Sequence, residues 1–114
     1  MNYKWRIVLA PFPFDDFSDD KLRPLLCLTN PVGENFHVVG AFITTQIPVA
    51  PEPFDILIDP TQPQWKGTGL KELSMLRLHR LTSFDVSRAR KGLGTCPENQ
   101  RGEIESRLRA LLDL

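Results

Sequence analysis

Short β-type segments follow one another along residues 7–81, and their spacing constrains the fold more than any other feature of the chain. Each segment is rich in Val, Ile, Leu or Phe and is bounded by proline, glycine, asparagine or aspartate. The intervals between them carry no helical period, so the helices that connect the strands of a parallel sheet are missing. Five strands joined by turns predict a small β-barrel. We expect these strands at residues 7–14, 24–28, 37–44, 54–58 and 74–81.

Helical sequence is confined to the part of the chain after the last expected strand. Ser83 can cap a short helical turn over residues 84–88, which Gly92 and Gly94 would end. Residues 95–98 (Thr-Cys-Pro-Glu) fit a capping box with proline in the first turn, and they predict the start of a C-terminal helix. The apolar stripe of this helix, expected to pack on the barrel or on a partner, consists of Ile104, Leu108, Leu111 and Leu112.

The length of 114 residues is enough for one hydrophobic core but not for two, so we expect a single domain over residues 1–114. No apolar run approaches the roughly 18 residues of a membrane helix. The N-terminal stretch is too short and too aromatic for a secretory signal, which favours a cytoplasmic protein. Cys27 and Cys96 lie far apart without a CxxC spacing and are expected to be free, partly buried thiols.

The charges cancel overall, with 14 basic and 14 acidic side chains and a sequence pI of about 6.7. A strong global field for nucleic acid is therefore excluded, and any nucleic-acid site must be local. Acidic residues cluster at 15–20, and basic residues cluster at 77–91. Solvated surface explains both clusters, and a charged patch beside a functional site is the alternative.

Four short motifs occur in a definite order along the chain. They are IVLAPFPF at 7–14, LRPLLCLTN at 22–30 after a polar loop, AFITTQ at 41–46, and the segment 74–85 that leads into a Thr-x-Asp-type helix start. Each motif alone is common, but their order and spacing are specific. Together they resemble the PemK-type toxins of the MazF family over nearly the whole chain.

The resemblance implies a mainly β, SH3-like small barrel of the MazF/CcdB type with a short helical turn and a C-terminal helix. It also implies a homodimer, cleavage of single-stranded RNA without metal or another cofactor, and a cognate antitoxin. One departure concerns Trp5-Arg6, where most relatives carry Gly-Asp. The change removes an acidic partner near the active face and adds a bulky ring, so activity or RNA preference can differ.

Arg23 and Thr44 are the expected catalytic residues. Attack by a ribose 2′-OH requires a proton acceptor, donors for the charge on phosphorus and a proton for the leaving 5′ oxygen. The planar guanidinium of Arg23 can hold two phosphate oxygens, and Pro24 biases Arg23 toward an extended backbone at the strand entrance. The resemblance also makes Arg23 the proton carrier, but arginine is a poor base, so the electrostatic role is favoured. Thr44, at a strand end, can donate its hydroxyl to phosphate.

Other residues are candidates for binding the substrate. Thr45 competes with Thr44, and Gln46 would point to the same side as Thr44. Leu76 and Leu78 should face the core, while Arg77 and His79 face the opposite side. His79 is an alternative proton carrier or an ordinary surface histidine, since no ligand cluster surrounds it. Phe17 and Trp65 are expected to be exposed and able to stack on bases.

Two further hypotheses concern partners. An acidic, disordered antitoxin tail could lie across Arg77, Arg80 and Arg88 and reach Arg23. The alternative function is that of a binding protein on the same barrel, either a gyrase poison or a catalytically silent partner. The chain ends in Leu-Leu-Asp-Leu at 111–114 rather than the Trp-Gly-Ile type of tip that the gyrase poisons carry, which argues against the poison.

Overall fold

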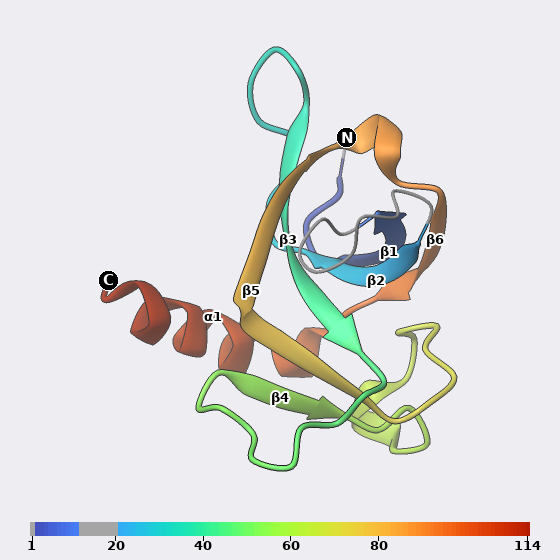
Figure 1. Cartoon of the computed structure of the whole chain (residues 1–114), viewed down its shortest axis with the longest axis vertical. Helices are drawn as coiled ribbons and strands as arrows, with labels where there is room; N and C mark the ends of the chain where they lie inside the picture. Colours follow the sequence, from blue (N-terminus) through green and yellow to red (C-terminus); the bar gives the residue numbers. More distant parts are fainter. Residues whose placement is uncertain (1, 12–20) are drawn as a thin grey trace.

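In a computed structural model, which describes residues 2–11 and 21–114, one curled six-stranded sheet carries a single α-helix (Figure 1). The strand order is β4-β5-β3-β2-β1-β6, and every pairing is antiparallel. The strands are β1 (Arg6–Pro11), β2 (Leu22–Cys27), β3 (His37–Thr44), β4 (Asp55–Ile58), β5 (Ser74–Asp85) and β6 (Lys91–Thr95). Two 3-10 turns, η1 (Pro63–Trp65) and η2 (Val86–Arg88), precede α1 (Glu98–Leu112). The predicted mainly β, barrel-like fold with a C-terminal helix is confirmed.

A bend in β5 gives the sheet its curl. Ala41 of β3 pairs with Leu81, whereas the next residue, Phe42, pairs with Arg77. Residues 78–80 are therefore extra on β5, and such a bulge bends a strand and increases its twist. Figure 1 shows β5 turning a sharp corner there, so that its first part pairs with β4 and β3 and its second part continues along β3 alone.

Apolar side chains are buried on both faces of the curled sheet, because neighbouring residues of a strand point to opposite faces. In β1, Ile7 belongs to one cluster and Val8 to the other; in β2, Leu26 and Leu25 divide in the same way. The larger cluster includes Trp5, Trp65 and Ile104 of α1. The smaller cluster consists of Val8, Ala10, Leu25, Cys27, Val38, Phe42 and Phe84.

The helix α1 packs on the sheet through fewer residues than expected. Ile104 is fully buried and Leu108 packs against the larger cluster, but Leu112 is 54% exposed. The predicted capping box is wrong, since Pro97 is the N-cap and no described side chain caps the helix. Thr95 is unavailable as a cap because it ends β6 and pairs with Arg6.

The strand β6 was not expected, because Gly92 and Gly94 were interpreted as breaks. Both lie inside the strand and pair with β1. The helical turn before β6 is shorter than predicted, since β5 continues to Asp85. The cap of η2 is Asp85, whose carboxylate accepts a hydrogen bond from the Ser87 amide at 2.9 Å, and Ser83 does not cap it.

Cys27 and Cys96 are free and buried, and burial raises the pKa of each thiol to about 11. Leu76 and Leu78 are buried, while Arg77 and His79 are partly exposed, as predicted. No helix in residues 2–11 and 21–114 is long and apolar enough to cross a membrane.

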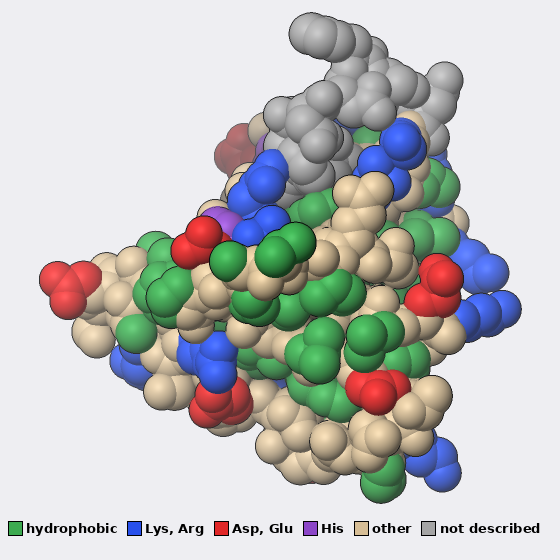
Figure 2. All heavy atoms as spheres, turned by 60° about the horizontal axis from the view of Figure 1, so that its bottom comes forward, with side chains coloured by type: hydrophobic (Ala, Val, Ile, Leu, Met, Phe, Trp, Pro, Cys, Tyr) green, Lys and Arg blue, Asp and Glu red, His purple; other side chains and the backbone are tan. Residues whose placement is uncertain are grey.

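Figure 2 shows hydrophobic side chains scattered over the face where β4 lies. The large exposed ones in this part of the chain are Ile47, Val49, Leu57 and Leu73.

Candidate functional site

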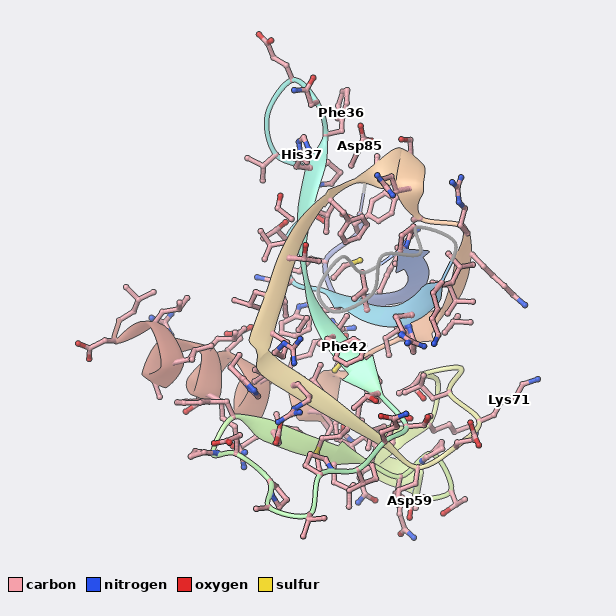
Figure 3. All side chains as sticks on the ribbon, in the orientation of Figure 1. Phe36, His37, Phe42, Asp59, Lys71 and Asp85 are labelled. Carbon is pink, nitrogen blue, oxygen red and sulfur yellow. The ribbon has the colours of Figure 1, made fainter. Side chains whose placement is uncertain are left out.

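A pocket of about 230 Å³ opens where β3 ends and β5 bends. Residues from β2, β3, the loop after β3 and β5 form its walls, although they are far apart in sequence. Phe42, labelled in Figure 3 near the end of β3, is part of this lining. The lining residues are Arg23, Pro24, Phe42, Thr44, Thr45, Gln46, Arg77 and Arg80. Five of the predicted site residues are thus brought together: Arg23, Thr44, Thr45, Gln46 and Arg77.

The strand register explains why Arg23 and Thr44 meet. Pairing of β2 with β3 runs from Cys27 opposite Gly40 to Leu25 opposite Phe42. Two more residues along each strand would place Arg23 opposite Thr44. Pro24 has no N–H to donate to β3, so it suits a position where the ladder stops. The pairing of β2 with β3 ends before these two residues, and both of them line the pocket.

Arg23 is half-buried and lies inside β2 rather than at its entrance, because the strand begins at Leu22. It pairs with Ala10 of β1. Within residues 2–11 and 21–114, no hydrogen bond or ion pair engages its guanidinium. The five N–H donors of Arg23 are therefore available to an anion in the pocket.

The two threonines differ in how firmly they are held. Thr44 is half-buried and pairs with Met75 of β5, and its Oγ1 accepts a hydrogen bond from the Gln46 amide at 3.0 Å. Because this bond uses a lone pair, the hydroxyl hydrogen of Thr44 remains able to donate. Thr45 follows the end of β3 and is exposed. Thr44 is the better-oriented donor of the two.

Arg77 has a carboxylate partner. Its Nε donates to Oδ1 of Asp55 at 3.0 Å and its Nη2 to Oδ2 at 3.4 Å. The two residues face each other across the β4–β5 ladder. The Asp55 side chain has no exposed surface, whereas that of Arg77 is 20% exposed. Asp55 was not recognised from the sequence, where it appeared as one polar residue of an alternating strand.

Arg80 also lines the pocket, although the sequence suggested it only as an antitoxin contact. In a regular strand, residues three apart point to opposite faces, so Arg77 and Arg80 would not meet. The bulge at residues 78–80 removes this restriction. Nothing in the period-two pattern of the sequence reveals a bulge, which is why this residue was missed.

Two predicted substrate-binding residues do not line the pocket. Trp65 is only 6% exposed and belongs to the larger core cluster, so the expectation of an exposed stacking ring is wrong. Its loop turns back at η1 and packs on α1, which buries the indole. His79 points its Nδ1 toward Asp55 Oδ1 at 3.9 Å, and this buried nitrogen has no hydrogen-bond partner among the described residues. Phe17 and the acidic run at 15–20 lie outside the described residues.

Across 2–11 and 21–114, no three His, Cys, Asp or Glu side chains converge. The chemistry that the pocket itself offers is that of three guanidinium groups, two hydroxyls and one amide. Such a donor set binds anions, and phosphate above all.

Comparisons with known proteins agree with this architecture. The chain matches the model of the "PemK-like, MazF-like toxin of type II toxin-antitoxin system" family over residues 3–112. A comparison with curated protein sequences found no match.

Several solved structures are similar to the chain. One is an endoribonuclease in complex with its cognate antitoxin from a mycobacterial species, with TM-score 0.73 and 14% identity, covering 100% of this chain and 97% of that one. A second is the Mycobacterium tuberculosis toxin MazF-mt6, with TM-score 0.70, 21% identity and coverage of 96% and 97%. A third is a MazE-MazF complex from Deinococcus radiodurans, with TM-score 0.67, 16% identity and coverage of 99% and 96%. The TM-scores show a shared fold despite the low identities, and the family match extends over nearly the whole sequence: the chain belongs to the PemK-like, MazF-like toxins of type II toxin-antitoxin systems.

Proposed function

We propose that this chain is an endoribonuclease that cleaves single-stranded RNA without a metal ion. In the proposed reaction a ribose 2′-OH attacks the adjacent phosphorus, and the 5′ oxygen of the next nucleotide leaves. The products are a cyclic phosphate and a 5′-OH. The observation that supports this most is the convergence of Arg23, Thr44 and Arg77 on one pocket.

The proposed roles follow from the geometry of the pocket. Arg23, whose donors are not used by the described residues, binds the non-bridging oxygens and stabilises the charge that grows on them. Thr44 donates its hydroxyl hydrogen to the same phosphate, because the hydrogen bond from the Gln46 amide engages the oxygen and leaves the hydrogen unused. Gln46 and Thr45, both exposed at the rim, bind the neighbouring phosphate or a base edge. The main role of Arg23 is to bind the phosphate anion, and proton transfer is its secondary role.

An antitoxin and a second copy of the chain are the proposed protein partners. Two of the similar structures are, by their titles, complexes of a toxin with an antitoxin. Arg77 and Arg80 line the pocket, so an acidic tail that crosses them would also cover Arg23. Arg88 lies on η2, away from the pocket lining, and can extend the basic path for a long tail.

Cleavage of a long, defined single-stranded RNA in excess EDTA tests the proposal. We expect specific cuts in EDTA, with ends that carry a cyclic phosphate and a 5′-OH, because the pocket supplies its charge from arginines. Mapping the ends also identifies the cleavage sequence. Intact RNA under these conditions would contradict the proposal and favour a binding protein on the same barrel.

Replacing Thr44 by valine distinguishes the role of Thr44 from that of Thr45. We expect kcat/KM to fall about ten- to a hundredfold, since a hydrogen bond to a charged group contributes about 1.5–3 kcal/mol. Thr44→Ser keeps the hydroxyl and should retain most of the activity. The matched change Thr45→Val should have a smaller effect, because Thr45 is exposed beyond the strand end. Equal losses for Thr44→Val and Thr45→Val, measured on one RNA oligonucleotide, would remove the special role of Thr44.

A further inference from the structure

We propose that Asp55 is a positioning residue, which holds the guanidinium of Arg77 in the orientation that binds the reacting phosphate. Asp55 itself does not line the pocket. Its effect on cleavage rests on the proposed function, whereas its effect on Arg77 can be tested without RNA.

The contact between the two side chains has the geometry of a fixed pair. Oδ1 and Oδ2 of Asp55 accept from Nε and Nη2 of Arg77, so two parallel hydrogen bonds define the plane of the guanidinium. The carboxylate is completely buried, and the pair is therefore little weakened by solvent. Of the five N–H donors of Arg77, two are used by Asp55 and three remain for a ligand.

The carboxylate is in turn held by its own surroundings. Oδ2 of Asp55 accepts from the Glu52 amide at 2.7 Å, and the Asp55 amide donates to the Glu52 carbonyl at 3.0 Å. Nη1 of Arg107, on α1, donates to the carbonyls of Pro53 and Asp55, both at 3.0 Å. The turn that leads into Asp55 and the first residue of β4 are thus attached to the helix, and the carboxylate has one defined position.

Asp55 also compensates positive charge at the pocket. Arg77 and His79, both on β5, face the carboxylate, with His79 Nδ1 at 3.9 Å from Oδ1. Three arginines line one small pocket, where like charges repel each other at short range. A buried carboxylate bonded to one of them offsets this repulsion and lets Arg77 line the same pocket as Arg23.

The two arginines Arg23 and Arg77 differ in how their guanidinium groups are held. Arg23 has its donors open to the pocket, whereas Arg77 is oriented by a partner on the neighbouring strand. A preoriented donor stabilises a transition state better than one that must reorganise, and small displacements of such a group lower rates strongly. Loss of Asp55 should therefore lower kcat more than it raises KM.

The test combines a spectroscopic measurement with a double-mutant cycle. In the wild-type protein, the Nε–H proton of Arg77 should give an NMR signal that exchanges slowly with water, and Asp55→Asn should remove this protection. For cleavage, Asp55→Asn should lower kcat about ten- to a hundredfold, with KM changed less than about threefold. In an Arg77→Ala background, Asp55→Asn should have no further effect on kcat, because a positioning residue acts only through its target.

Matched variants keep the inference falsifiable if Asp55→Asn folds poorly. Asp59→Asn changes a carboxylate one residue beyond β4, which accepts from Thr61 and does not line the pocket, and it should leave kcat unchanged. Arg77→Lys keeps the charge and Asp55 but removes the two parallel hydrogen bonds, and it should lower kcat as Asp55→Asn does.

Three results would overturn the inference: a rapidly exchanging Arg77 Nε–H in the wild type, full activity of Arg77→Lys, or an equal loss from Asp55→Asn with and without Arg77. If the wild-type protein does not cut RNA, the proposed function fails, and the exchange measurement alone still supports or overturns the positioning of Arg77.

Discussion

Arg23→Ala is expected to slow RNA cleavage roughly a hundred- to a thousandfold, the usual cost of removing one donor that stabilises developing charge. The guanidinium of Arg23 lines the pocket and is not engaged by the described residues, so an anion can use all of its donors. The midpoint of thermal unfolding should change little, because removal of Arg23 leaves no described partner unpaired.

The measurement is kcat/KM on a defined RNA oligonucleotide together with thermal unfolding by circular dichroism. Arg23→Lys should recover only part of the activity, since an ammonium cannot hold two phosphate oxygens in one plane. Arg109→Ala is the matched control, because Arg109 is an exposed arginine in the last turn of α1, away from the pocket. Wild-type rates for Arg23→Ala would exclude Arg23 from the site.

Gly69→Ala is expected to lower the free energy of unfolding by about 3 to 5 kcal/mol, combining backbone strain with overpacking. Gly69 has a φ of +76°, which residues with a side chain rarely adopt. An added Cβ would lie 2.0 Å from the carbonyl oxygen of Leu93 in β6. This atom belongs to the backbone and cannot rotate away. A β-carbon on Gly94 would meet the same loop, at 2.2 Å from the Gly67 oxygen.

Urea denaturation measures this effect, and Gly102→Ala is its control. Gly102 lies inside α1, where an added Cβ would meet no described atom within 4 Å apart from its chain neighbours and the helix's own backbone. Alanine should therefore raise the free energy of unfolding by about 0.5–1 kcal/mol, because it restricts the unfolded chain and favours the helix. Equal stabilities for Gly69→Ala and the wild type would show that the contact between this loop and β6 is not as close as described.

The fold class could be predicted from the sequence because it depends on local patterns. Hydrophobic periodicity located the expected strands approximately and the C-terminal helix, and the missing crossover helices excluded a parallel sheet. Strand β6 was missed for a physical reason. Gly92 and Gly94 lower local strand propensity, but Gly94 is required where the loop at Gly67 packs against the strand. Sequence alone does not reveal such a contact between distant segments.

The candidate site divides in the same way. Arg23, with its proline, and Thr44, at the end of a β run, are identifiable from neighbouring residues, and their order along the chain is what resembles the family. Two other residues could not be placed from local sequence. Arg80 lines the pocket because of the bulge in β5, and Trp65 is buried in the larger core cluster because its loop folds back.

The sequence by itself determined five of the six strand-forming segments, the family and the chemical types of the side chains at the site, since these depend on residues close together in the chain. Only the tertiary structure decided which of those side chains meet. The register of β2 and β3 brings Arg23 to Thr44, and the pairing of β4 with β5 provides Arg77 with Asp55. Both pairings join residues distant in sequence. Whether such residues come into contact depends on the packing of the whole sheet and not on any local pattern.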